Sequence, residues 1–366
     1  MTVAPDTLSL FLELAAIPSP SGEERAVAER VSGYLGHLGL AVERDDFGNL
    51  LARMEPTATD GGVPIFLCSH LDTVPPTGPI EPVVDDGVVR NAAGTILGAD
   101  NKASVAAMLE VARRLREERR PHAGVELLFT LGEETGLEGA KAFDPSRLDA
   151  RLGFVFDYSG RIGHVVSAAP YARKMRFVVK GRAAHSGIAP EEGRSAIYAA
   201  ARAIADLRLG RIDEETTANV GKIEGGTAGN VVPDRCRVSA EARSRDARKL
   251  ANVVQEILDS FAFGAAASEC ELETTVNEDY EGYRFRPDDP VFSLACRALE
   301  RAGFDPRPVE VGGGSDANVF NARGVPCVNI ANGMSDVHTP DEHIAVEDLD
   351  AIVRVSLELV DLARAA

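Results

Sequence analysis

The sequence carries an apolar run into a histidine and an aspartate at Leu67-Cys68-Ser69-His70-Leu71-Asp72-Thr73-Val74. The run begins at Val63, and contiguous apolar residues are typical of a strand that is buried on both faces of a parallel sheet. His70 and Asp72 follow where this strand ends. Because open α/β sheets bind ligands at the carboxyl ends of their strands, we expect a functional site at this edge.

Strand and helix patterns alternate on both sides of this stretch. Residues 101–119 have apolar side chains at helical spacing, and residues 125–131 and 152–156 are predicted to be buried strands. Alternating strands and helices favour a mainly parallel sheet with helices on both faces, which is an α/β fold.

Local signals predict further elements near the N-terminus. Residues 6–16 are expected to form a helix capped by Asp6, and Ser21 with Glu24 matches a capping box for the next helix. Residues 42–53 contain Asp-Phe-Gly-Asn between two short strand-like runs, which indicates a hairpin.

The pattern changes after about Ala169. The predicted order is strand, helix, strand, strand, helix, strand, which fits a ferredoxin-like α+β module. Its predicted strands are 175–180, 219–224, 236–243 and 270–276, and its predicted helices are 193–207 and 246–261. We therefore expect a catalytic domain in two parts, residues 1–170 and 282–366, with a lid domain, residues 171–281, inserted between them.

Composition restricts the partners of the protein. The 366 residues carry a formal net charge of -18, which repels nucleic acid and anionic membranes, so we expect neither as a partner. The N-terminal residues lack a secretory pattern, and no apolar run reaches the roughly 20 residues that span a bilayer. The five cysteines form no CxxC pair. We predict a cytoplasmic protein with free thiols.

Acidic residues and a second histidine follow the other strand ends: Asp100, Glu133, Glu134, Asp157 and His338. Two adjacent metal ions need histidine nitrogens and carboxylate oxygens, one bridging carboxylate, and a base that does not bind metal. A His-x-Asp pair can also be structural, and paired glutamates often begin a helix. Neither alternative explains why these residues share one sheet edge, so we interpret them as a two-metal hydrolytic centre.

The chain resembles the M20 family of metallopeptidases, and within it the peptidase T-like (M20B) aminopeptidases. The resemblance rests on motifs that occur in the family's order: His70-Leu71-Asp72-Thr73-Val74, Gly98-Ala99-Asp100-Asn101-Lys102, Gly132-Glu133-Glu134-Thr135-Gly136, Phe156-Asp157-Tyr158 and His338-Thr339-Pro340. It implies the zinc-peptidase fold for the catalytic domain, and the predicted insertion lies where the family places its lid.

The resemblance also implies roles for these residues. Asp100 would bridge two divalent ions, usually Zn²⁺, with Mn²⁺ or Co²⁺ as alternatives. His70 and Asp157 would complete one metal site, and Glu134 and His338 the other. Asp72 would orient the imidazole of His70. Glu133 would act as the general base on a bridging water and then as the general acid.

Further residues match the family's substrate site. His185 would stabilise the oxyanion, in dimeric members from the neighbouring subunit, so a homodimer through the lid is a further expectation; a surface-turn histidine is the alternative. Asn230 and Arg243 would hold the substrate's carbonyl or terminal carboxylate, although strand-end polarity also explains them. Gly313 and Gly314 belong to a glycine-rich turn that could face the substrate or serve only as a tight turn.

The function implied is removal of the N-terminal residue from short peptides, as in a tripeptidase. An aspartate at position 157 favours aminopeptidases and dipeptidases, because the family's carboxypeptidases and deacylases generally have glutamate there. An M20-type N-acyl-amino-acid amidohydrolase or deacylase, or a dipeptidase, is the alternative enzyme. A binding protein that kept the fold without activity is a third possibility.

Overall fold

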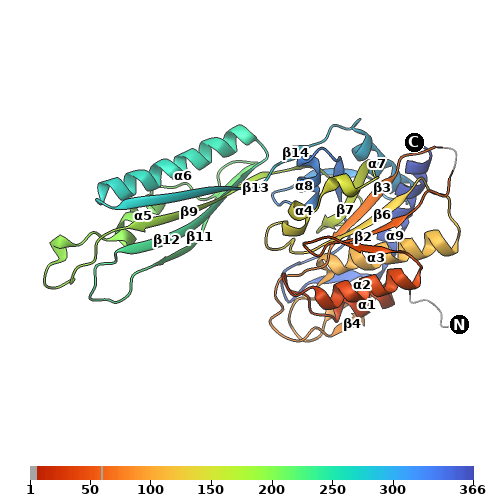
Figure 1. Ribbon diagram of the computed structural model, residues 1–366, viewed down its shortest axis with the longest axis horizontal. Coiled ribbons are helices and arrows are strands. Elements are labelled where there is room, and N and C mark those ends of the chain that lie inside the picture. Colours follow the sequence, from red (N-terminus) through yellow and green to blue (C-terminus); the bar gives the residue numbers. More distant parts are fainter. Residues whose placement is uncertain (1–5, 59–60) are drawn as a thin grey trace. The chain divides into compact units, whose positions relative to one another are not determined.

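The computed structural model describes residues 6–58 and 61–366 (Figure 1). The chain forms two compact units. The first contains the residues up to Ser167 with Arg284–Glu310 and Ser315–Ala366, and the second contains Ala168–Tyr283 with Val311–Gly314. The predicted insertion, 171–281, lies within the second unit. Residues 1–5 of the first predicted segment lie outside the described residues.

The first unit is built on a sheet in the order β1-β2-β6-β3-β7-β16-β8-β14, with β15 paired to β8. β3 is parallel to both β6 and β7, and β7 is parallel to β16. Every residue of β3, β6 and β16 is buried, which confirms a mainly parallel sheet with strands covered on both faces. The strands are β1 (Val42–Arg44), β2 (Leu50–Met54), β3 (Ile65–His70), β6 (Val125–Thr130), β7 (Leu152–Tyr158), β8 (His164–Ala169), β14 (Tyr283–Arg284), β15 (Arg307–Glu310) and β16 (Cys327–Ala331).

Helices cover both faces of this sheet, as predicted. α3 and α9 contact β3 from one side, and α8 contacts β7 and β16. Successive side chains of a strand point to opposite faces. Accordingly Leu67 joins the core under α3, whereas the ring of Phe66 lies 5.0 Å from that of Phe320 in α8. The helices are α1 (Thr7–Ala15), α2 (Arg25–His37), α3 (Ala99–Glu117), α4 (Glu138–Ala142), α7 (Pro290–Arg301), α8 (Asp316–Ala322) and α9 (Val346–Arg364).

The N-terminal predictions have mixed outcomes. Asp6 caps α1 by accepting a hydrogen bond from the Ser9 N–H, and β1 and β2 form the predicted hairpin. The predicted capping box at Ser21 and Glu24 is wrong. α2 begins at Arg25 without a side-chain cap, because the Ser21 hydroxyl donates to Asp72 instead. Ser21 and Glu24 instead form hydrogen bonds in the site described below.

The sequence analysis missed a small sheet in the order β17-β5-β4. Its strands are β4 (Pro82–Asp85), β5 (Val88–Asn91) and β17 (His343–Ala345). Asp86 and Gly87 join β4 to β5 with φ angles of 46° and 75°. An Asp-Gly pair between two valine-rich runs is a strong hairpin signal, so the β4–β5 hairpin could have been predicted from the sequence.

The second unit is the ferredoxin-like module. Its sheet runs in the order β10-β11-β12-β9-β13, with every neighbouring pair antiparallel. Helices α5 and α6 lie on one face (Figure 1), where the rings of Phe177 and Phe261 stack 3.8 Å apart. The elements are β9 (Tyr171–Lys180), α5 (Ala196–Ala205), β10 (Gly210–Arg211), β11 (Thr216–Gly225), β12 (Arg235–Ser244), α6 (Ala247–Ala267) and β13 (Glu271–Tyr280).

Helix α6 extends past the predicted end at residue 261, through Gly264. Glycine usually weakens a helix. A Cβ at Gly264 would lie 2.8 Å from the Ala199 carbonyl oxygen and 3.1 Å from the Ala203 Cβ, both in α5. Gly264 therefore allows the two helices to pack closely. In the described part of the chain, no helix is both long enough and apolar enough to cross a membrane.

Asp348 makes the stability of the first unit depend on pH. It lies in the first turn of α9, where burial raises its pKa to about 6, with repulsion from Glu347 adding to the shift and Arg161 opposing it. An unfolded aspartate ionises near pH 4. Between about pH 4 and pH 6 the folded protein therefore holds a proton that the unfolded chain has lost, and this contribution to stability disappears as the pH rises through 6.

We expect Asp348→Asn to raise the free energy of unfolding relative to wild type by about 1 kcal/mol above pH 6.5, after solvent screening is allowed for, and by less at pH 4.5. Urea titrations of both proteins across this range measure the difference. Asp350→Asn, at an exposed position of the same helix, is the control. A difference that does not change with pH would contradict the assigned titration.

Candidate metal centre

The predicted ligands meet at the carboxyl ends of the parallel strands. His70 is the last residue of β3, and Asp157 lies at the end of β7. Asp100 stands at the beginning of α3 with non-helical backbone angles, so its side chain is not held on the helix surface. Glu134 and His338 come from the loops that follow β6 and β16.

Asp100 lies between the two histidines. Its Oδ1 is 3.1 Å from Nε2 of His70, and its Oδ2 is 3.2 Å from Nε2 of His338. Each histidine also meets a second carboxylate: His70 Nε2 is 3.3 Å from Asp157 Oδ1, and His338 Nε2 is 2.9 Å from Glu134 Oε1. The side chains are therefore arranged as two groups that share Asp100.

This donor set fits divalent metal ions. Ligand atoms of His70, Asp100 and Glu134 all lie within 4.8 Å of one another. Imidazole nitrogens and carboxylate oxygens are donors that zinc and neighbouring transition metals accept. Since Asp100 turns one oxygen toward each histidine, the arrangement can hold one ion on either side of this carboxylate.

Asp72 fixes the position of the loop that carries Glu133 and Glu134. Its carboxylate accepts hydrogen bonds from the backbone N–H of Glu133 at 3.0 Å and of Glu134 at 3.1 Å, and from the Ser21 hydroxyl at 2.7 Å. Nδ1 of His70 lies 2.9 Å from the Asp72 backbone oxygen and 3.4 Å from its Oδ1. Asp72 thus contacts His70 and also anchors the glutamate loop, and its role in orienting the imidazole stays a prediction.

Glu342 has a similar role for Asp100, and the sequence analysis missed it. Its side chain is 2% exposed. Oε2 accepts from the N–H groups of Leu97 at 2.8 Å and Gly98 at 2.9 Å, and Oε1 accepts from the Asp100 N–H at 3.0 Å. Because these hydrogen bonds join positions more than 240 residues apart, no local sequence pattern predicts the role of Glu342.

Asparagines support Asp157 in the same way. The side-chain amide of Asn101 donates to Asp157 Oδ1 at 2.8 Å, and the backbone N–H of Asp157 donates to the side-chain oxygen of Asn329 at 3.0 Å. Glu24 accepts from the Gly132 N–H at 3.1 Å and so holds the start of the glutamate loop. Supporting contacts of this kind orient ligands and tune their affinity for metal.

The pKa values reflect crowded negative charge. Burial, with added repulsion from Asp157, Asp316 and Glu134, raises the pKa of Glu133 well above its ordinary value. Burial likewise raises the pKa of Asp157 to about 7, against the attraction of His70. Contacts with Asp100 and Glu134 raise the pKa of His338 to about 10. Cations bound among these carboxylates would relieve the repulsion.

Asp316 lies beneath the centre and does not cap α8. Ser315 and Asn318 form the capping box, whereas the Asp316 carboxylate accepts from the hydroxyl of Thr130, the last residue of β6. Oδ1 of Asp316 has no hydrogen-bond partner within the described residues. Burial raises the pKa of Asp316 to about 6. Asp316 therefore contributes a buried acid below the predicted metal site.

The predicted substrate residues of the second unit fall into two places. The His185 and Asn230 loops are adjacent, since His185 forms a β-bridge with Val231 and the Ser186 N–H donates to the Asn230 carbonyl at 3.0 Å. His185 is exposed, and its Nδ1 accepts from the Gly187 N–H, which leaves Nε2–H as the donor of the neutral ring. Arg243 lies on β12, outside these loops.

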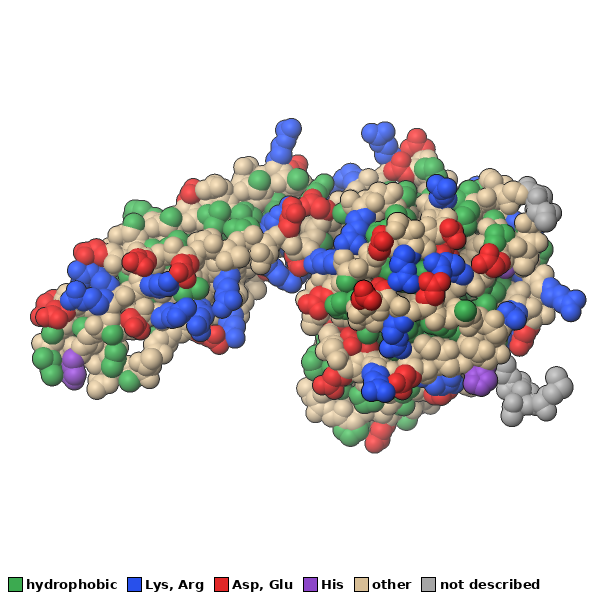
Figure 2. Space-filling view, in the orientation of Figure 1, with side chains coloured by type: hydrophobic (Ala, Val, Ile, Leu, Met, Phe, Trp, Pro, Cys, Tyr) green, Lys and Arg blue, Asp and Glu red, His purple; other side chains and the backbone are tan. Residues whose placement is uncertain are grey.

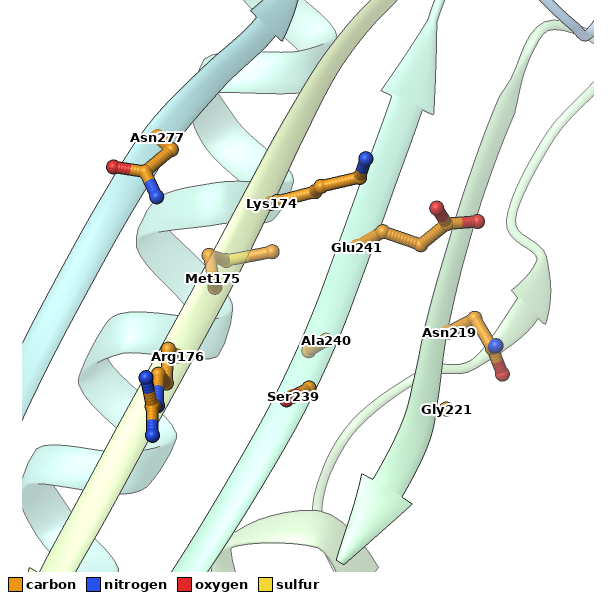
Figure 3. A pocket seen from close by; sticks show the side chains of 9 residues that line it. All are labelled: Lys174, Met175, Arg176, Asn219, Gly221, Ser239, Ala240, Glu241 and Asn277. Carbon is orange, nitrogen blue, oxygen red and sulfur yellow. The ribbon is translucent and has the colours of Figure 1, made fainter. Parts of the chain in front are cut away.

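The sheet of the second unit has a hollow, and Glu241, which lines it (Figure 3), pairs with Arg243. The hollow has a volume of about 430 Å³ and is lined by Lys174, Met175, Arg176, Asn219, Gly221, Ser239, Ala240, Glu241 and Asn277. Arg243 Nη2 lies 3.1 Å from Glu241 Oε2. On the face of this unit that Figure 2 shows, basic and acidic side chains lie among hydrophobic ones, and neither sign of charge dominates that face.

The chain leaves the second unit and re-enters the first within the glycine-rich turn, since Val311–Gly314 belong to the second unit and Ser315 belongs to the first. A Cβ at Gly314 would lie 2.5 Å from the ring of Tyr280, which explains this glycine by packing. A Cβ at Gly313 would meet nothing within 4 Å. A contact of either glycine with substrate stays a prediction.

Comparisons with known proteins identify the family and relatives of this chain. Residues 66–362 match the peptidase family M20/M25/M40. The chain is 39% identical over 368 residues to the uncharacterized protein YqjE of Bacillus subtilis, covering 97% of this chain and 98% of that protein. It is 26% identical over 279 residues to peptidase T of Escherichia coli (strain K12), covering 73% of this chain and 66% of that protein.

Solved structures of the same fold are also similar along nearly the whole chain. The crystal structure of aminopeptidase PepT from Bacillus cereus matches with a TM-score of 0.86 and 40% identity, over 97% of both chains. A tripeptidase from Staphylococcus aureus matches with a TM-score of 0.91 and 35% identity, over 98% of both chains.

Asp72→Asn tests the anchor of the glutamate loop. An amide can present an oxygen to only one of the Glu133 and Glu134 N–H groups, so one hydrogen bond is lost. We expect metal affinity to fall roughly 10- to 100-fold, as for other contacts that orient ligands. Titration against a competing chelator measures it. Ser21→Ala removes only the hydroxyl donor and should have a smaller effect; equal affinities for Asp72→Asn and wild type would refute the anchor.

Proposed function

Because the chain belongs to peptidase family M20/M25/M40, we propose that it is a two-metal aminopeptidase that removes the N-terminal residue from short peptides, tripeptides among them. The observation that carries the two-metal part is the Asp100 carboxylate, which turns one oxygen toward His70 and the other toward His338. Zinc is the ion we propose, with manganese or cobalt as alternatives.

Two relatives support the choice of substrate. The structures at 40% and 35% identity are described as an aminopeptidase and a tripeptidase, and each matches nearly all of this chain. The aspartate at position 157, which the resemblance to the family links to aminopeptidases and dipeptidases, lies 3.3 Å from His70. We infer from both points that this chain acts on peptides with a free amino terminus.

The proposed chemistry assigns Glu133 the proton transfers. Bound divalent ions supply polarisation of the scissile carbonyl and a lowered pKa for water. The Glu133 side chain has no hydrogen-bond partner in residues 6–58 and 61–366, while Asp72 fixes its backbone, so its carboxylate is positioned and free to accept a proton. Glu133 would then donate that proton to the leaving amine.

The second unit would contribute substrate recognition. Nε2–H of His185 is a suitable donor for a developing oxyanion, and the neighbouring Asn230 side chain can donate to a carbonyl. Arg243 can bind a carboxylate with two parallel hydrogen bonds. We further propose a homodimer formed through this unit, the arrangement that would let His185 serve the partner's centre.

Turnover of a substrate panel by the zinc-loaded enzyme tests this function. The panel contains tripeptides, dipeptides, N-acetylated tripeptides and N-acetyl amino acids. We expect hydrolysis of free tripeptides at the first bond and none of their acetylated forms. Exclusive turnover of N-acyl amino acids would establish the amidohydrolase alternative, and exclusive turnover of dipeptides would establish a dipeptidase. Tight metal binding with no turnover would favour a protein that only binds.

Glu133→Gln should keep the bound metal and lower kcat at least about 100-fold, because an amide cannot accept the proton and such transfers contribute 10²–10⁴-fold. Tripeptide kinetics and metal analysis of the same sample measure both quantities. Glu138→Gln, at an exposed position of the same segment, should retain normal turnover. Near-normal turnover by Glu133→Gln would remove Glu133 as the base.

His185→Ala should lower kcat without changing metal content, because the lost Nε2–H donor acts on the transition state; losing one such donor typically costs 10²–10³-fold. Steady-state kinetics with a tripeptide and metal analysis check this. Ile188→Ala, three residues along the same exposed loop, is the matched control. Unchanged kinetics for His185→Ala would return this residue to the surface-turn alternative.

A further inference from the structure

The first unit also has a cavity, which lies at the opposite end of the strands from the metal centre. Its volume is about 540 Å³. Met54, which lines it, pairs with Val125, the first residue of β6, whereas Thr130 at the other end of β6 pairs with His70. The length of β6 separates the two sites by roughly 20 Å. The cavity is therefore no part of the proposed active site.

The cavity combines an apolar floor with a basic wall. Leu40, Met54 and Leu115 are 8%, 7% and 2% exposed and provide the floor. The polar lining consists of Arg53, Glu55, Thr57, Arg116, Arg119, Arg120 and His122. Four arginines around one glutamate are unexpected in a protein with a net charge of -18. Such concave sites with an apolar lining and a few polar groups commonly bind small molecules.

Two of these four arginines have an ionic partner among the described residues, and the other two have none there. Arg53 pairs with Glu43 and Glu126, and Arg120 pairs with Asp361. In the part of the chain that the structure describes, the side chains of Arg116 and Arg119 form no hydrogen bond or ion pair. Their positive charges are therefore available to a ligand.

The acidic residues in the C-terminal half of α3 and just after it are already bound by other arginines, and Glu55 is the one carboxylate among the described residues of the cavity lining. Arg113 pairs with Glu110 and Glu117, and Arg114 pairs with Glu118. The negative end of the α3 dipole favours Arg116 in the last turn. It does not account for Arg119, which lies beyond the last helical residue with a φ of 51°.

The cavity wall also holds these groups in place. The guanidinium of Arg116 lies over Gly39, where a Cβ would come within 2.8 Å of Nη2. His122 is 3% exposed, and its Nδ1 accepts from the Gly124 N–H at 3.3 Å. Burial lowers the pKa of His122, so the ring is neutral and Nε2–H is its remaining donor. The wall thus offers donors and positive charge to one ligand.

We propose that this cavity binds a small organic anion, in which a phosphoryl or carboxylate group pairs with Arg116 and Arg119 and a compact apolar body lies on Leu40, Met54 and Leu115. Guanidinium groups bind both oxyanions through charge-assisted hydrogen bonds. Nothing in the proposed peptidase reaction requires this ligand, so the site is independent of the active centre.

Isothermal titration calorimetry on the zinc-loaded protein at low ionic strength tests the proposal, with phenyl phosphate, phenylacetate and benzyl alcohol as probes. We expect at least one anion to bind and the neutral alcohol not to bind. Tighter binding of phenyl phosphate would identify the phosphoryl class, and tighter binding of phenylacetate the carboxylate class. A second binding event at the metal centre should be the same in every variant below.

Arg116→Ala/Arg119→Ala should weaken the cavity event at least about 10-fold, the expected loss for charge-assisted hydrogen bonds. Arg44→Ala/Arg90→Ala changes the net charge equally at exposed arginines outside the cavity and should leave the affinity unchanged. Arg119→Gly alone suits the positive φ, keeps the fold, and should still weaken binding. Anion binding that is absent, or insensitive to Arg116 and Arg119, or equally weakened by the Arg44 and Arg90 substitutions, would overturn the proposal.

Discussion

Mutual repulsion among buried carboxylates is the constraint around which the first unit is organised. Asp72, Asp100, Asp157 and Asp316 are brought together at one sheet edge because parallel strands end side by side. Burial and repulsion raise the pKa values of Asp157 and Asp316 to about 7 and about 6. Carboxylates crowded in this way need cations, either from His70 and His338 or from metal ions. The cluster is therefore suited to a site that binds cations.

Hydrogen bonds to buried carboxylates hold the segments that carry Glu133, Glu134 and Asp100. Asp72 and Glu342 accept backbone N–H groups from the two segments that carry the glutamates and Asp100. Each is a buried anion satisfied by several donors, which is favourable only when the partner loop takes one conformation. The loops that carry the proposed ligands are therefore held in place by hydrogen bonds of the fold itself.

The architecture of the first unit could be predicted from the sequence because apolar runs and strand ends are local patterns. The apolar run up to Ser69 predicts a buried strand, and the strand ends predict where His70 and Asp157 meet. The roles of Glu342 and Ser21 could not be predicted from the sequence. Each residue acts through a hydrogen bond to a residue distant in the chain, and the sequence around each resembles an ordinary loop. The capping-box prediction at Ser21 failed for this reason: Asp72 competes for the same hydroxyl. The β4–β5 hairpin, in contrast, had a local Asp-Gly signal that was overlooked.

Anomalous diffraction from zinc-loaded crystals at the zinc absorption edge would show whether two metal ions share Asp100. We expect two anomalous peaks about 3.5 Å apart, one on each side of the Asp100 carboxylate, with His70 and Asp157 at one and Glu134 and His338 at the other. A single peak beside Asp100, or peaks that do not contact it, would rule out a shared Asp100.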